Sequence, residues 1–263
     1  MTGSIDQIEF DRTLPDALLA PAWQAAEHER PANLPAYEAT ALIGRLWQNG
    51  RTLSIAFVED ALPPDLRKSV PGLVQQYAGR WLEHANLAFA WGAVAEEAEI
   101  RIGFDPALGN WSYIGTDALA FTNGEITMNL GALARPLAEE QVRRIVLHEF
   151  GHALGLVHEH QSPAAGIRWN RDAVLRAFAG PPNHWDPEKV EINIFRRYDR
   201  THSQYADLLP QGTEFDPDSI MIYRIPPEWT LGDVAYRENT DLSPTDIRFI
   251  TRCYPGSKME SIP

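Results

Sequence analysis

An α+β fold built from two subdomains is predicted by three features of the sequence. Alternating, β-branched stretches are confined to the first half of the chain. Between residues 138 and 154, apolar side chains cover nearly the whole circumference of a predicted helix, which indicates that this helix is buried between layers. After residue 155, Pro, Asn and Asp become frequent. We therefore expect an upper subdomain at 46–155, a more irregular, partly helical lower subdomain at 156–263, and a cleft between them.

The upper subdomain is expected to contain a twisted sheet and a backing helix. Alternation and Asn-Gly turns predict strands over 53–58, 99–104, 111–114 and 125–130. The backing helix is predicted over 69–90, because apolar residues recur there at helical spacing and a proline stands in the first turn. The two predicted helices would pack against the sheet.

Two further helices are predicted in the lower subdomain. One runs over 169–178, with Asn170 as a possible N-cap. The other begins after Ser243, with Pro244 at its first position and Asp246 completing a capping box. Residues 180–217 are rich in loop signals.

Composition excludes several classes of function. The chain has 263 residues, enough to bury a core without disulfides. Its formal net charge of −13 disfavours nucleic acid and anionic membranes as partners. No apolar run approaches the roughly 20 residues of a spanning helix. We therefore expect neither nucleic acid nor a membrane as a partner. We also expect a monomer.

The N-terminal region, residues 1–45, is interrupted by prolines and is interpreted as an extension. It could be a propeptide, an inhibitory arm or a packing segment. It offers no signal-peptide pattern, and Cys253 is the only cysteine, so no intrachain disulfide can form. The sequence as written predicts a cytoplasmic protein; the alternative is export by a signal-independent route or after upstream processing.

The strongest chemical signal is the stretch His-Glu-Phe-Gly-His-Ala-Leu-Gly-Leu-Val-His at 148–158. On a helix, His148 and His152 lie one turn apart on the same face, so both imidazoles can reach one metal ion. Gly155 can end the helix in a left-handed conformation, and His158 can then return as a third ligand. Three imidazoles leave one zinc position open for water, which is typical of catalytic zinc. Glu149 is close enough to act on that water.

This extended motif resembles that of the metzincin metalloproteases. Glu159, directly after the third histidine, makes it similar to the astacin branch. Other stretches that resemble astacin-like proteins follow in the expected order. They are Trp111, Ser112, Tyr113 and Gly115; Ser219 to Tyr223; and Leu242, Ser243, Pro244 and Asp246. The resemblance extends from about Leu46 to Pro255.

The resemblance implies a metzincin-like (zincin) fold and a zinc-dependent endopeptidase. Glu149 would be the general base, His148, His152 and His158 the ligands of one Zn²⁺, and Met221 an apolar floor in a Met-turn. Tyr223 would support the transition state and could also ligate the metal.

The substrate would be a protein or peptide bound in extended form along residues Glu125–Leu130, expected at the edge of the sheet. An ordinary internal strand is the alternative for that segment. Two other functions stay open: hydrolysis of a non-peptide amide, and a catalytically silent, zinc-containing scaffold that binds peptides. Glu149 argues against the scaffold.

Three residues near the motif or at the C-terminus are expected to have other roles. Glu159 would pair with neighbouring groups rather than catalyse. His160 would lie beside the site or face solvent. Cys253 would be a small buried hydrophobe.

Overall fold

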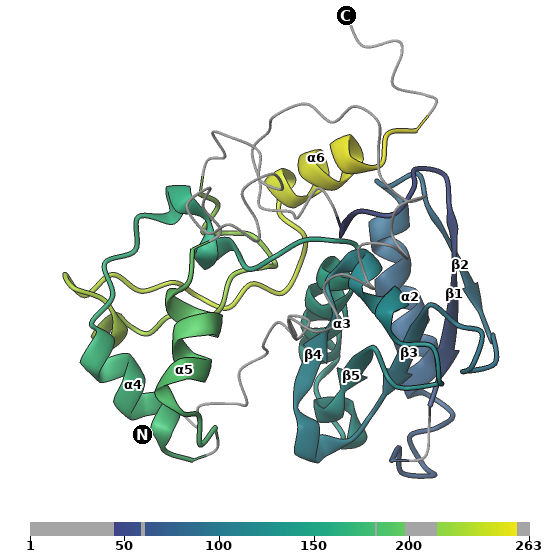
Figure 1. Cartoon of the computed structure of the whole chain (residues 1–263), viewed down its shortest axis with the longest axis horizontal. Coiled ribbons are helices and arrows are strands. Elements are labelled where there is room, and N and C mark those ends of the chain that lie inside the picture. Colours follow the sequence, from purple (N-terminus) through teal and green to yellow (C-terminus); the bar gives the residue numbers. More distant parts are fainter. Residues whose placement is uncertain (1–44, 59–60, 182, 198–214, 257–263) are drawn as a thin grey trace, which may run out of the picture.

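The computed structural model describes residues 45–58, 61–181, 183–197 and 215–256. The extension predicted at 1–45 lies outside these residues, apart from Arg45. Figure 1 shows the sheet with α2 and α3 on one side of the molecule and α4 and α5 on the other. The predicted division of the chain at residue 155 remains a prediction.

In the described part of the chain, the sheet has five strands in the order β2-β1-β3-β5-β4. They are β1 Thr52–Phe57, β2 Ala88–Trp91, β3 Ile100–Gly103, β4 Asn110–Ser112 and β5 Met128–Leu130. β1 pairs in parallel with β2 and β3, and β3 pairs in parallel with β5. Only β4 runs antiparallel, against β5. All four predicted strands are confirmed, but just the last three residues of 125–130 form β5.

Five α-helices accompany the sheet among the described residues. They are α2 Val70–Leu82, α3 Glu139–Ala153, α4 Arg171–Ala179, α5 Pro187–Val190 and α6 Pro244–Cys253. A π-helical turn, Glu191–Phe195, follows α5. Short 3₁₀ helices cover Pro106–Leu108, Gly115–Ala120, Gly131–Ala134, Glu159–Gln161, Pro163–Ala165 and Pro227–Trp229. The predicted caps hold: the Asn170 side chain accepts a hydrogen bond from the Ala173 amide, and Ser243 and Asp246 form the capping box of α6.

The backing helix was predicted too long. α2 ends at Leu82, and residues 88–90, predicted as its last turn, belong to β2. Their alternation fits a strand, because Phe89 and Trp91 turn towards Phe150 of α3 with ring centroids 5.5 and 6.0 Å away. The residues between Leu82 and Ala88 return the chain to pair with β1 in parallel.

The predicted edge strand was also wrong. β5 lies between β3 and β4, so the strand within 125–130 is internal, and β4 forms this edge of the sheet. The physical reason is that Asn110–Ser112 turns back to pair antiparallel with Met128–Leu130, which covers the outer side of β5. A period-two pattern indicates a strand but not its neighbours.

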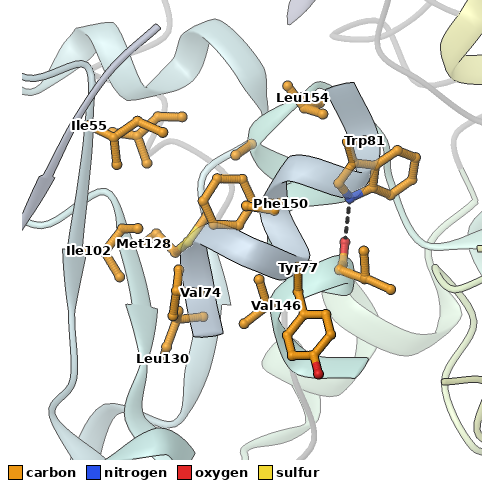
Figure 2. Close-up of a cluster of buried hydrophobic side chains, with 14 of the residues drawn as sticks. Ile55, Val74, Tyr77, Trp81, Ile102, Met128, Leu130, Val146, Phe150 and Leu154 are labelled. Atoms are coloured by element: carbon orange, nitrogen blue, oxygen red, sulfur yellow. Dashed lines mark hydrogen bonds between the residues drawn. The ribbon is translucent and has the colours of Figure 1, made fainter. Parts of the chain in front are cut away.

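The main core lies between the sheet, α2 and α3, and Figure 2 shows its centre. Ile55, Ile102, Met128 and Leu130 of the sheet meet the two helices there. Residues of α6, including Cys253, join the same cluster. Cys253 is buried, as predicted, and burial raises its thiol pKa to about 12. A second apolar cluster surrounds α4, α5 and the π-helical turn.

Three side chains hydrogen-bond carbonyl groups near the C-terminal end of α3. The Trp81 indole donates to Leu147 O at 3.0 Å, the bond drawn in Figure 2. The Trp47 indole donates to Ala153 O at 2.8 Å, and the Tyr254 hydroxyl donates to Leu154 O at 2.8 Å. The last carbonyls of a helix lack intrahelical donors, so the contacts to Ala153 and Leu154 hold the C-terminal end of α3, and the contact to Leu147 holds the helix just before His148.

Two glycines should respond oppositely to the same substitution. Gly155 ends α3 with a φ of +99°, and a Cβ there would lie 2.6 Å from Leu46 Cδ2. Gly79 lies inside α2, where an added Cβ would meet nothing within 4 Å. We expect Gly155→Ala to lower the free energy of unfolding by about 1–3 kcal/mol and Gly79→Ala to raise it by roughly 0.4–1 kcal/mol. Urea denaturation of both variants measures this, and changes of the same sign would contradict the account.

Candidate metal centre

Three buried imidazoles converge on one point. His148 and His152 lie one turn apart on α3, and His158 follows the turn at Gly155. Their Nε2 atoms are 3.1, 3.2 and 3.1 Å from one another. A tetrahedral zinc ion with bonds of about 2.0–2.1 Å requires its ligand atoms to lie about 3.3 Å apart. The three nitrogens therefore fit a zinc ion closely.

Backbone carbonyls set the orientation of two of these rings. His148 Nδ1 donates to Ile220 O at 2.8 Å, and His152 Nδ1 donates to Leu156 O at 2.9 Å. Because a carbonyl only accepts, the proton of each neutral ring must be on Nδ1. Each Nε2 then carries the lone pair that a metal needs. The donor chemistry thus matches the geometry.

The end of α3 builds this geometry from the sequence. The Leu156 amide donates to Gly151 O at 3.0 Å, and the Gly155 amide donates to His152 O at 2.8 Å. These bonds reverse the chain through the left-handed glycine. The Leu156 carbonyl thereby lies within hydrogen-bonding distance of His152 Nδ1, and His158 returns to the helix. The predicted convergence of the three histidines is confirmed.

Glu149 is completely buried, although it is a carboxylate. It follows His148 on α3, in the turn that carries the first two histidines. A carboxylate is rarely buried unless it has a specific role or partner. The structure thus buries a carboxyl group in the helical turn that carries His148 and His152.

Met221 and Tyr223 approach the histidines from the segment after residue 218. A Cβ added to Gly151 would overlap Met221 Sδ, so the methionine packs against α3 between His148 and His152. The Tyr223 ring lies 4.1 Å from the His158 ring and 6.0 Å from the His148 ring, measured between centroids. Both residues are buried. The structure therefore brings the Tyr223 ring beside the His148 and His158 rings and packs Met221 against α3.

Glu159 and His160 are both buried next to His158, so Glu159 contacts a neighbouring group as predicted and His160 takes the first of its two predicted positions, beside the site. The Glu159 carboxylate accepts a hydrogen bond from the Asp216 amide at 3.0 Å, and burial raises its pKa to about 8. The His160 ring is buried rather than facing solvent, and its Nε2 lies 3.1 Å from Asn193 O in the π-helical turn. His160 also stacks on His158, with centroids 5.2 Å apart. The π-helical turn beside the site gave no recognisable signal in the sequence.

Asp246 has a second role that the sequence did not reveal. Besides capping α6, its carboxylate accepts hydrogen bonds from Ser219 Oγ at 2.7 Å and from the Ile220 amide at 2.8 Å. Burial raises its pKa to about 6, although these hydrogen bonds act in the opposite direction. The capping-box pattern identified the residue but not its contact with the segment that contains Met221.

A five-stranded mixed sheet, a buried helix carrying two histidines and a third histidine after a glycine turn define a zincin-type metalloprotease. Comparison with solved structures identifies the relatives. One structure of myroilysin is 34% identical, with a TM-score of 0.72, covering 82% of this chain and 98% of that one. A second is 31% identical, with a TM-score of 0.58, covering 95% of this chain and 99% of that one. The chain belongs to the astacin family of zinc metalloproteases, and its cofactor is Zn²⁺.

A more distant match is high choriolytic enzyme 1, a hatching-enzyme zinc-protease from the medaka fish Oryzias latipes. It is 16% identical with a TM-score of 0.47, covering 82% of this chain and 94% of that one. No protein-family model matched the sequence, and no curated protein matched it. Among the described residues, no helix is both long and apolar enough to cross a membrane.

Proposed function

We propose that this chain is an endopeptidase that hydrolyses internal peptide bonds of extended protein substrates. The observation that carries the proposal is the convergence of three Nε2 atoms within 3.2 Å of one another beside a fully buried Glu149. His148, His152 and His158 hold the zinc ion. Zinc, when bound, supplies Lewis acidity, which makes water acidic enough to be a nucleophile near neutral pH and polarises the substrate carbonyl.

Glu149 moves the proton. Its carboxylate accepts a proton from the attacking water and then delivers it to the nitrogen of the leaving amine as the C–N bond breaks. Burial keeps this carboxylate out of bulk water, which strengthens its interaction with the reacting groups. A scaffold that only bound peptides would have no physical need for this carboxylate.

Tyr223 stabilises the reacting carbonyl. Its ring lies against His158 at 4.1 Å, so its hydroxyl is carried on a segment adjoining the metal ligands. A phenolic donor can hydrogen-bond the negative charge that develops on the carbonyl oxygen. The Met221 side chain packs against Gly151, between the two helical histidines in the sequence, and so supports that part of α3.

The substrate pairs with the edge strand β4, Asn110–Ser112. Within the part of the chain that the structure describes, β4 is the last strand of the sheet, next to β5. An extended peptide added to its other side would gain main-chain hydrogen bonds that do not depend on side-chain identity. Such binding suits an enzyme that acts within unfolded segments.

The test is digestion of casein by the zinc-loaded chain, with fragments identified by mass spectrometry. We expect peptides from internal cleavage, and none after chelation of the metal. Full-length protein and protein lacking residues 1–44 are compared, because the N-terminal segment could be inhibitory. If neither releases a fragment while each holds about one zinc ion, the endopeptidase proposal is wrong.

A further inference from the structure

The ligand His148 is connected to a distant carboxylate through one peptide group and one hydroxyl group. Its Nδ1 donates to Ile220 O at 2.8 Å. The same peptide group carries the Met221 amide, which donates to Ser219 Oγ at 3.0 Å. The Ser219 hydroxyl in turn donates to Asp246 Oδ1 at 2.7 Å. Each proton in this series points towards Asp246.

The series is buried along its whole length. His148, Ser219, Ile220, Met221 and Asp246 are each at most 2% exposed. Hydrogen bonds linked in one direction polarise one another, and low local dielectric strengthens the effect. A negative charge at one end therefore makes the Ile220 carbonyl a better acceptor and the His148 ring a stronger electron donor.

We propose that Asp246 is a positioning residue for the zinc centre, acting on His148 through the Ser219 hydroxyl and the Ile220–Met221 peptide group. This inference rests on the proposed role of His148 as a ligand. Histidine ligands commonly donate their second nitrogen to a carboxylate or carbonyl, which fixes the ring and raises its basicity. Here the carboxylate acts from helix α6, two hydrogen-bonding groups away.

Other contacts hold the same segment, so the relay can be cut without releasing it. Asn239 Nδ2 donates to Ser219 O at 3.0 Å, and the Glu159 amide donates to Met221 O at 3.0 Å. The Ile220 amide still reaches Asp246 if the hydroxyl is lost. Ser219→Ala therefore removes the link and leaves most of the anchoring in place.

Ser243→Ala provides a matched control. Ser243 is also a buried serine that contacts Asp246, but its hydroxyl caps α6 by accepting from the Thr245 and Asp246 amides. It takes no part in the relay to His148. An effect that comes from lost stability alone should therefore appear in both serine variants. An effect of the relay on zinc affinity should appear only in Ser219→Ala.

The experiment measures the zinc dissociation constant of the full chain by competition with a chromophoric chelator at pH 7.5. Wild type, Ser219→Ala, Ser243→Ala and Asp246→Asn are compared, with thermal melting of each apo form. We expect Ser219→Ala to weaken zinc binding by about tenfold or more, and Ser243→Ala to stay within about twofold of wild type. Asp246→Asn should match or exceed the Ser219→Ala effect if it folds.

The outcomes separate the two proposals. Wild-type protein that binds no zinc would overturn the proposed function together with this inference. Ser219→Ala that binds zinc as tightly as wild type would overturn the inference alone. Equal weakening in Ser219→Ala and Ser243→Ala would also overturn it, because the effect would then follow stability rather than the relay.

Discussion

Replacing Glu149 by Gln is expected to lower kcat for peptide hydrolysis by about 10²–10⁴-fold while zinc stays bound. The amide has nearly the same shape as the carboxylate but cannot accept the proton of the attacking water. Glu149 is completely buried on α3, so the exchange removes a charge without exposing the site. Steady-state kinetics with an internally quenched peptide, alongside zinc content, measures the effect.

The matched control is Glu140→Gln on the same helix. Glu140 lies in the first turn of α3, and its side chain is 66% exposed. We expect its activity and zinc content to match wild type. Cleavage that persists at the wild-type rate in Glu149→Gln would show that another group is the base.

Replacing His158 by Ala is expected to abolish tight zinc binding and with it the stabilisation that zinc confers. Zinc bound to the folded state alone, at a free concentration 1,000 times its dissociation constant, stabilises it by about 4 kcal/mol. The wild type should therefore melt at a clearly higher temperature with zinc than with chelator. In His158→Ala the two melting curves should nearly coincide.

Two comparisons sharpen this prediction. His84→Ala, outside the site, should keep the zinc-dependent shift of wild type. The apo forms of wild type and His158→Ala are also compared. A difference between them measures the effect of the substitution on the fold itself, separately from zinc binding. A zinc-dependent shift of wild-type size in His158→Ala would mean that the third ligand has been misassigned.

The metal centre could be predicted from sequence because its geometry is local. Helical spacing fixes His148 against His152, and one left-handed glycine brings His158 back to them. Only 11 residues, 148 to 158, are involved. The capping signals at Asn170 and Ser243 succeeded for the same reason, since each depends on backbone groups within three residues.

The parts that sequence missed depend on distant segments. β2 continues the apolar pattern after α2, and only its pairing with β1 distinguishes strand from helix there. The edge position of β4 follows from its pairing with β5, which spacing cannot reveal. The contact of Asp246 with Ser219 joins residues 27 positions apart in the sequence. In each case a local pattern identified the residues, and tertiary pairing determined their role.

The central claim is that three histidines hold one zinc ion, and a crystal structure of the zinc-loaded chain tests it most directly. Data collected on both sides of the zinc absorption edge locate the ion by its anomalous scattering. We predict a single strong peak within about 2.0–2.1 Å of the Nε2 atoms of His148, His152 and His158. A peak at another site, or none at these histidines in protein that contains zinc, would contradict the account.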